Sequence, residues 1–223
     1  MNWSNDIKPK QLKAYRALYS FGIDDIHSSW IKEIPYCEGL SRKKNAVIRD
    51  QYLSDYIFEH LNLKQGDTIE LEQAIPPLLL MSADSLEQIF TLFGAIQFQQ
   101  EIAHTIIKSD LVSLKRSNGT HIYEFTLSHA RLISLPPLSN KEALLKLYDT
   151  NPGNALKIAG AKTLNQAFNI KNKPLRQRIR YKLPKQYFNH FLKSPCDITN
   201  RTIMATAEKL AKDFSIPCSH LLA

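Results

Sequence analysis

Cysteine and histidine side chains are the groups in this sequence that could bind a metal ion or act as nucleophiles. The three cysteines are an odd number and too few for a disulfide framework. A zinc set could be drawn only from Cys196, Cys218, His190 and His220, which lack the closely spaced ligand pairs of structural zinc modules. Cys218 lies near His220, but a partly apolar cysteine in such a place is more often a packing residue than an activated thiol. The sequence therefore predicts neither a metal site nor a reactive thiol.

Known catalytic motifs are absent from the sequence. It contains no glycine-rich phosphate loop, no GxGxxG, no HExxH, no CxxC pair and no nucleophile elbow. The carboxylate pairs Asp24-Asp25 and Glu70/Glu72 have no convergent partner, and they are typical of a helix start and a solvated face. We predict no catalytic residue and no cofactor, and the chain is not expected to be an enzyme.

A basic segment, KNKPLRQRIRYKLPK at 171–185, is the clearest candidate for binding. It contains seven Lys and Arg residues and no acid, whereas residues 1–140 carry a net charge of −2 and residues 141–223 one of +10. Such a cluster attracts a polyanion or an acidic protein face, although a solvated helix face is the alternative. The candidate partner-binding residues are Lys171, Lys173, Arg176, Arg178, Arg180, Lys182 and Lys185.

Nucleic acid is the alternative partner for this basic segment. Four aromatic residues lie in or next to it and could stack on bases, namely Tyr181, Tyr187, Phe188 and Phe191. However, Phe188 and Phe191 also form an ordinary apolar stripe, and no helix-turn-helix spacing, RNA-binding aromatic motif or zinc knuckle accompanies them. Nucleic-acid binding therefore rests on electrostatics alone, and we do not expect it.

The elements that would position these residues are helices. Glycine is scarce, at 7 of 223 residues, which argues against turn-dense all-β chains. Helical punctuation recurs along the whole chain, so the predicted fold is all-α, an irregular multi-helix array. In the first part, helices are expected from Pro9 to Phe21, from Asp24 to Pro35 with Trp30 on its apolar side, and from Ser41 to about Leu61.

The clearest predicted helix begins at Asp84. Asp84 and Glu87 are placed to form a reciprocal cap, and an apolar stripe follows at Leu86, Ile89, Phe90, Phe93 and Ile96 and continues at Ile102, Ala103, Ile106 and Ile107. The residues before it, from Leu71, form an irregular connection whose end at 78–81 is buried. Gly94 lies inside the helix, where glycine is unfavourable by about 1 kcal/mol. We predict that it allows the close approach of a neighbouring helix.

Two further features lie in the middle of the chain, and the second marks a boundary. Asn118-Gly119 is followed by a predicted helix over 120–133, with a short β-hairpin near 112–126 as the alternative. Pro136-Pro137 coincides with the change in charge composition. We therefore expect an N-terminal helical part, 1–137, and a basic C-terminal helical part, 138–223, packed together as one domain.

The C-terminal part shows several helix boundaries. Ser139 to Glu142 form a capping box that opens a helix to Tyr148, and Asn151-Pro152 can cap the next one. Short helical pieces are predicted over 162–170, 174–183 and 185–192. A longer helix over 197–214 has Ile203, Ala207, Leu210 and Ala211 on its buried side, and the tail 216–222 is apolar enough to dock on the body.

Two features of the sequence indicate where in the cell the protein is located. The first residues lack the apolar core of a signal peptide, and no stretch reaches the ~18 apolar residues of a membrane span. We expect a cytoplasmic protein that does not insert into the membrane directly.

Three segments of the chain resemble the SctK family of bacterial type III secretion systems, the YscK/PscK-type sorting-platform proteins with OrgA and MxiK as distant relatives. They are SLEQIFTLFGAIQFQQEIAHTIIKS, in which Leu92-Phe93-Gly94 matches an apolar pair with glycine, the basic strip LRQRIRYKLP, and the ending LAKDFSIPCSHLLA. Weaker similarity covers IHSSWIKEIP and SHARLISLPPL, whereas SRKKNAVIRDQYL and NPGNALKIAGAKTLNQ depart from the family.

The resemblance implies a helical, non-enzymatic adaptor at the cytosolic face of the inner membrane. It would link the cytosolic domain of SctD, in the inner-membrane ring, to the pods formed by SctQ, with SctL as a further candidate partner. A secretion chaperone or effector-binding module is the remaining alternative.

Overall fold

The computed structural model describes residues 26–35, 52, 55–61, 81–105, 112, 115–116, 119–138, 141–166, 173–187 and 201–216. Every regular element in these ranges is helical, which confirms the predicted all-α class. Besides a helical segment over 55–60, the elements are α2 (Ser28–Ile31), α5 (Ala83–Gln97), α6 (Gln99–Ala103), α8 (Thr120–Ser128), η3 (Ala130–Leu132), α9 (Lys141–Thr150), α10 (Pro152–Asn165), α11 (Lys173–Lys182), η4 (Lys185–Tyr187) and α12 (Arg201–Asp213). None of these described helices is long and apolar enough to cross a bilayer.

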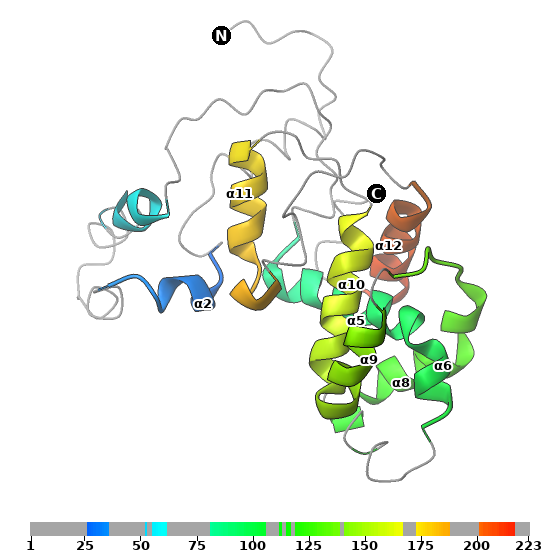
Figure 1. The fold of residues 1–223 in the computed structure, drawn as a ribbon. Helices are drawn as coiled ribbons and strands as arrows, with labels where there is room; N and C mark the ends of the chain where they lie inside the picture. Colours follow the sequence, from blue (N-terminus) through cyan, green and yellow to red (C-terminus); the bar gives the residue numbers. More distant parts are fainter. Residues whose placement is uncertain are drawn as a thin grey trace, which may run out of the picture.

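Among the described helices, the most extensive contact joins α5 to α10 (Figure 1). A Cβ atom added to Gly94 of α5 would lie 2.0 Å from the carbonyl oxygen of Leu156, and one added to Gly160 of α10 would lie 1.8 Å from that of Phe90. The two backbones therefore touch through a reciprocal pair of glycines. The predicted role of Gly94 is confirmed, and its counterpart is Gly160.

Helices α6, α8, α9 and α12 surround this pair and complete the larger core (Figure 1). The apolar stripe of α5 is fully inside, and all four residues predicted for the buried side of α12 are buried. Gln97, at the end of α5, donates hydrogen bonds to the Pro136 carbonyl at 2.9 Å and to the Thr163 hydroxyl at 3.2 Å. The segment around Pro136 is thereby held against both central helices.

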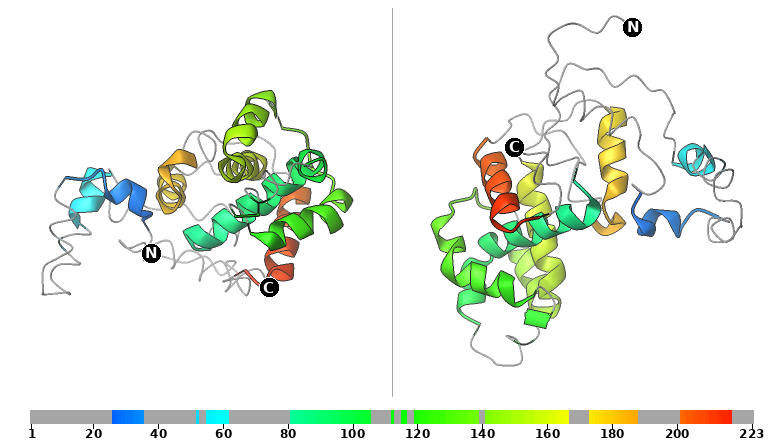
Figure 2. Two further views of the ribbon diagram at one scale, coloured as in Figure 1. Left: turned by 90° about the horizontal axis from the view of Figure 1, so that it is seen from below. Right: turned by 180° about the vertical axis from the view of Figure 1, so that it is seen from behind.

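A second, smaller core lies apart from the first, on the far side of α11 (Figures 1 and 2). Its buried residues in the described part of the chain are Ile26, Trp30, Ile34, Ile57 and Tyr181. Tyr181 belongs to this smaller core, whereas Leu183 and Tyr187 belong to the larger one. The segment 181–187 therefore connects the two apolar bodies.

Three predicted features of the elements are wrong. The N-cap of α5 is Ser82, whose hydroxyl accepts from the Ser85 amide, while Glu87 pairs with Lys157 at 2.7 Å instead of reaching back to Asp84. The helix also breaks at Phe98 before α6, and α10 continues to Asn165, where a separate piece was expected to begin at 162. For Glu87, the ion pair with Lys157 on α10 replaces the predicted local cap.

The hairpin alternative near 112–126 is also wrong. Residues 112, 115, 116 and 120–126 are helical, and Gly119 precedes α8 with φ of +88°. Glycine is needed there to start a helix from a positive φ, not to turn a hairpin. The predicted cap at Asn151 is confirmed, since its side chain accepts from the Asn154 amide. Burial of Met81 and Ile216 also matches the sequence prediction.

Several sequence predictions lie outside the described residues. They are the helix from Pro9, the caps at Asp24, Ser41 and Ser139, most of the connection 71–80, the continuation at Ile106 and Ile107, residues 188–192, and the tail after Ile216. The boundary at 137/138 stays a prediction.

Candidate partner-binding surface

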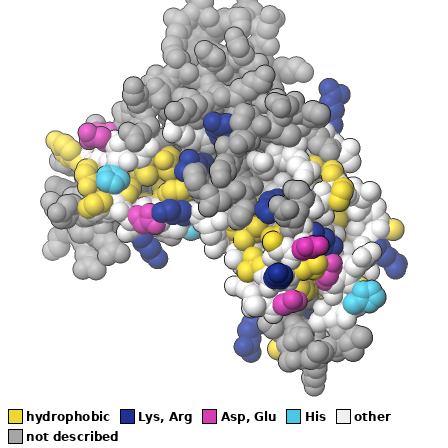
Figure 3. Space-filling model, viewed as in Figure 1, with side chains coloured by type: hydrophobic (Ala, Val, Ile, Leu, Met, Phe, Trp, Pro, Cys, Tyr) yellow, Lys and Arg dark blue, Asp and Glu magenta, His cyan; other side chains and the backbone are white. Residues whose placement is uncertain are grey.

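The predicted basic surface is centred on α11. Arg176 and Arg180 are half-buried, Lys182 is only 7% exposed, and Lys185 in η4 is exposed. Lys173 and Arg178 belong to α11 by backbone, but their side chains lie outside the description, as does the whole of Lys171. On the face shown in Figure 3, Lys and Arg side chains are scattered rather than gathered in one strip.

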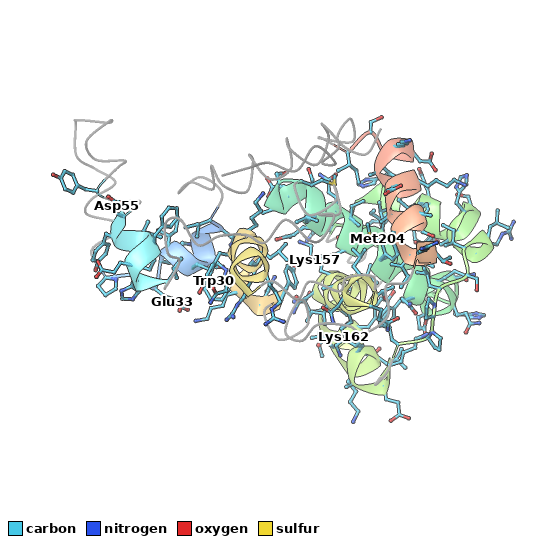
Figure 4. All side chains as sticks on the ribbon, turned by 90° about the horizontal axis from the view of Figure 1, so that it is seen from above. Trp30, Glu33, Asp55, Lys157, Lys162 and Met204 are labelled. Carbon is cyan, nitrogen blue, oxygen red and sulfur yellow. The ribbon has the colours of Figure 1, made fainter. Side chains whose placement is uncertain are left out.

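Arg180 is packed against the aromatic residues of the smaller core. Its guanidinium carbon lies 5.5 Å from the centre of the Trp30 ring and 5.7 Å from that of Tyr181. The two rings meet edge to face at 5.0 Å, and the Trp30 indole donates a hydrogen bond of 2.7 Å to the Leu183 carbonyl. In Figure 4, Trp30 lies beside α11. A guanidinium above an indole is attracted by the ring electrons. Arg180 therefore helps to hold α2 against the end of α11.

Lys185 contributes to the same contact from the other side. Its ammonium group pairs with the Glu33 carboxylate and lies 5.7 Å from the Trp30 ring centre, while its backbone amide donates to the Ser29 hydroxyl at 2.9 Å. In addition, the amide of His27 donates to the Tyr181 carbonyl at 2.9 Å. The region 26–35 is thus bound to 180–185 by side-chain and backbone contacts together.

Burial alters the ionisation of this cluster. Desolvation lowers the pKa of Arg180, and the positive charge of Arg176 acts in the same direction, whereas Tyr181 opposes them. Desolvation raises the pKa of Tyr181, and Arg180 partly offsets that rise. Arginine nevertheless remains charged in proteins, so the cation–aromatic contact persists across the physiological pH range.

These contacts divide the seven predicted residues. Arg180 and Lys185 already have partners within the chain, and Lys182 is buried, so binding of an external partner by these three would compete with the fold. The docking prediction consequently concentrates on the beginning of α11, near Arg176. Tyr181 and Tyr187 are 8% and 0% exposed, and neither is available as a stacking platform for bases.

No group of His, Cys, Asp or Glu among the described residues could hold a metal ion. The four residues of the disfavoured zinc set, Cys196, Cys218, His190 and His220, lie outside that part of the chain.

The family described as YOP proteins translocation protein K (YscK) matches this chain over residues 8–223. The chain belongs to the YscK family. No curated protein and no solved structure shows significant similarity to it.

Membership of the YscK family makes the chain a component of type III secretion, concerned with protein translocation. The resemblance found in the sequence is confirmed, and YscK is not a known enzyme family. Sequence reasoning missed two features of this YscK-family chain, the contacts of Trp30 with the basic segment and the role of Gly160. The run Ala159-Gly160-Ala161 was an available signal for the second, since small residues permit close helix approach.

Proposed function

We propose that this YscK-family protein is a non-enzymatic adaptor of the type III secretion sorting platform. It joins the cytosolic domain of SctD, at the cytosolic face of the inner membrane, to the SctQ pods, with SctL as a further candidate partner. The observation that carries this proposal is the family match over residues 8–223, nearly the whole chain.

The arrangement of the two cores supports an adaptor. An adaptor must present separate surfaces to two partners at the same time, and it must hold those two surfaces in a fixed position relative to each other. Here one chain forms two apolar bodies, and the segment 181–187 contributes side chains to both. Each body therefore has its own exposed surface, while the connection is packed rather than a free linker.

A bridging experiment tests the proposal. The SctD cytosolic domain is immobilised, the wild-type chain is added, and SctQ follows. We expect SctQ to be retained only when the chain is present. Failure to retain SctQ, with both partners folded, would contradict the bridging role.

The contribution of α11 is tested by charge reversal. Arg176→Glu combined with Arg178→Glu leaves Arg180 and Lys185 in place, so the contacts to Trp30 are preserved. We expect slower association with one partner, with the largest effect at low salt, because peripheral charges act mainly on the association rate.

The matched control is Lys146→Glu combined with Arg116→Glu, which makes the same change of charge at two exposed positions outside α11. Equal effects of the two double variants would show that net charge, and not the α11 surface, governs association.

A further inference from the structure

An apolar pocket separates α8 and η3 from α12. Its volume is about 830 Å³, and Phe125, Leu132, Ile133, Leu210 and Phe214 line it. Leu132 is 77% exposed, although it is a large apolar residue. A single exposed leucine is common, but one that continues the wall of an apolar pocket extends the surface available to a partner.

A second pocket adjoins the first. It has a volume of about 520 Å³ and shares two lining residues with its neighbour, His121 and Phe214. Asp84 and Glu87 of α5 also line it, and Glu87 is paired with Lys157. The two pockets therefore adjoin at His121 and Phe214, and together they are called the recess below.

The charges around the larger pocket are opposite in sign to the chain as a whole. Glu124 on α8 and Asp213 on α12 face it from opposite walls, together with Lys209. Neither carboxylate forms an ion pair with any other residue in the described part of the chain. With Lys209 counted and the lining His121 and His129 neutral, the larger pocket keeps one net negative charge in a protein of net charge +8, which favours a ligand with basic side chains over a phosphate.

We propose that this recess is the docking site for an amphipathic helix of a partner protein. Apolar side chains on one face of that helix enter the pocket beside Leu132, and basic side chains on its flanks pair with Glu124 and Asp213. Helices α8 and α12 form the two walls, and a third helix can pack between two others with its ridges in their grooves. The identity of the partner rests on the proposed function, since SctD and SctQ are the proteins to be tested.

The test compares two leucines of the same region. Leu132→Asp places a carboxylate in the recess, whereas Leu127→Asp makes the same change on α8 at a residue that is 40% exposed and lines neither pocket. Both positions are exposed, so both variants should fold, and thermal unfolding checks this. Binding of each variant to the SctD cytosolic domain and to SctQ is measured by titration.

We expect Leu132→Asp to weaken binding to one partner by about tenfold or more, because a charge replaces an apolar contact that becomes buried on binding. Leu127→Asp should remain close to the wild type. Equal binding by wild type and Leu132→Asp would overturn the docking site while leaving the adaptor intact. If the wild type binds only one of the two partners and Leu132→Asp abolishes that binding, the docking site is upheld and the bridging role is overturned. Binding to neither overturns both.

The charge component has its own test. Glu124→Lys combined with Asp213→Lys should weaken the same interaction and reverse its dependence on salt, because the basic flanks of the helix would then be repelled. Stronger binding by this double variant would show that the partner face is acidic, which contradicts the proposed ligand.

Discussion

Replacing Gly94 or Gly160 by alanine should destabilise the protein, although alanine is the better helix former. The added methyl carbon would lie 2.0 Å from the Leu156 oxygen in the first case and 1.8 Å from the Phe90 oxygen in the second. Ordinary contact begins near 3.4 Å. Both obstructing atoms belong to helix backbones, so no side-chain rotation can relieve the overlap, and α5 and α10 must move apart.

The magnitude follows from two opposing effects. Alanine loses less backbone entropy than glycine when a helix forms, and this difference favours alanine by about 1 kcal/mol. Against this, overpacking of a tight core is unfavourable by about 1–3 kcal/mol, and gaps opened along α5 and α10 lose dispersion contacts. Because the displacement needed exceeds about 1 Å and involves two buried helices, we take the upper end. The expected net loss is about 2 kcal/mol for each substitution, or roughly 4–8 °C in the unfolding midpoint for a chain of this size.

Urea unfolding followed by far-ultraviolet circular dichroism measures this loss. Ala205→Gly on the exposed side of α12 is the control, and it should lose about 1 kcal/mol through propensity alone. In the double variant of Gly94 and Gly160 the helices are already separated by the first substitution, so the combined loss should be smaller than the sum. A Gly94→Ala or Gly160→Ala variant as stable as the wild type would refute the close-contact argument.

Three further perturbations test other contacts. Trp30→Ala removes a residue only 8% exposed and its hydrogen bond to Leu183, and should destabilise the protein by about 3 kcal/mol in thermal unfolding, while Trp30→Phe should lose about 1 kcal/mol. Ser82→Ala removes the N-cap of α5 and should lower the free energy of unfolding by about 1 kcal/mol, with no loss of helix elsewhere by circular dichroism. Burial, followed by the negative charge of Glu87, raises the pKa of Tyr187 above the ordinary 10.0. The neutral form is therefore favoured in the fold, so its stabilisation is complete below about pH 10 and is lost as pH rises further. Urea midpoints at about pH 9 and about pH 11 should differ less in Tyr187→Phe than in the wild type, and equal differences would contradict this assignment.

The helices that could be predicted from the sequence are those with a strong apolar period. The stripe of α5 and the buried side of α12 follow directly from residues spaced three and four apart, because that spacing places side chains on one face of a helix. The cap at Asn151 was predictable for a similar reason. Its side chain and the amide it binds are three residues apart, so the interaction is local.

Features that depend on distant residues could not be predicted in the same way. Glu87 is well placed for a local cap, but Lys157, 70 residues further along the chain, takes its carboxylate. Arg180 and Lys185 look like surface charges in the sequence, but both contact the ring of Trp30. Trp30 lies far away in the chain, 153 residues before Leu183, whose carbonyl accepts the hydrogen bond of its indole. Charge and periodicity describe a side chain and its neighbours, and they do not indicate which remote residue will meet it.

The contacts of Trp30 also change how a binding experiment on the basic segment must be interpreted. Substitution of Arg180 or Lys185 removes a cation from the Trp30 ring as well as a charge from the surface, so lost binding could follow from displacement of α2. Substitution of Arg176 leaves those ring contacts intact. If binding depends on Arg176 and Arg178 while thermal stability does not, docking and folding use different parts of the same basic segment. If both fall together, the segment contributes to binding only by holding the smaller core in place.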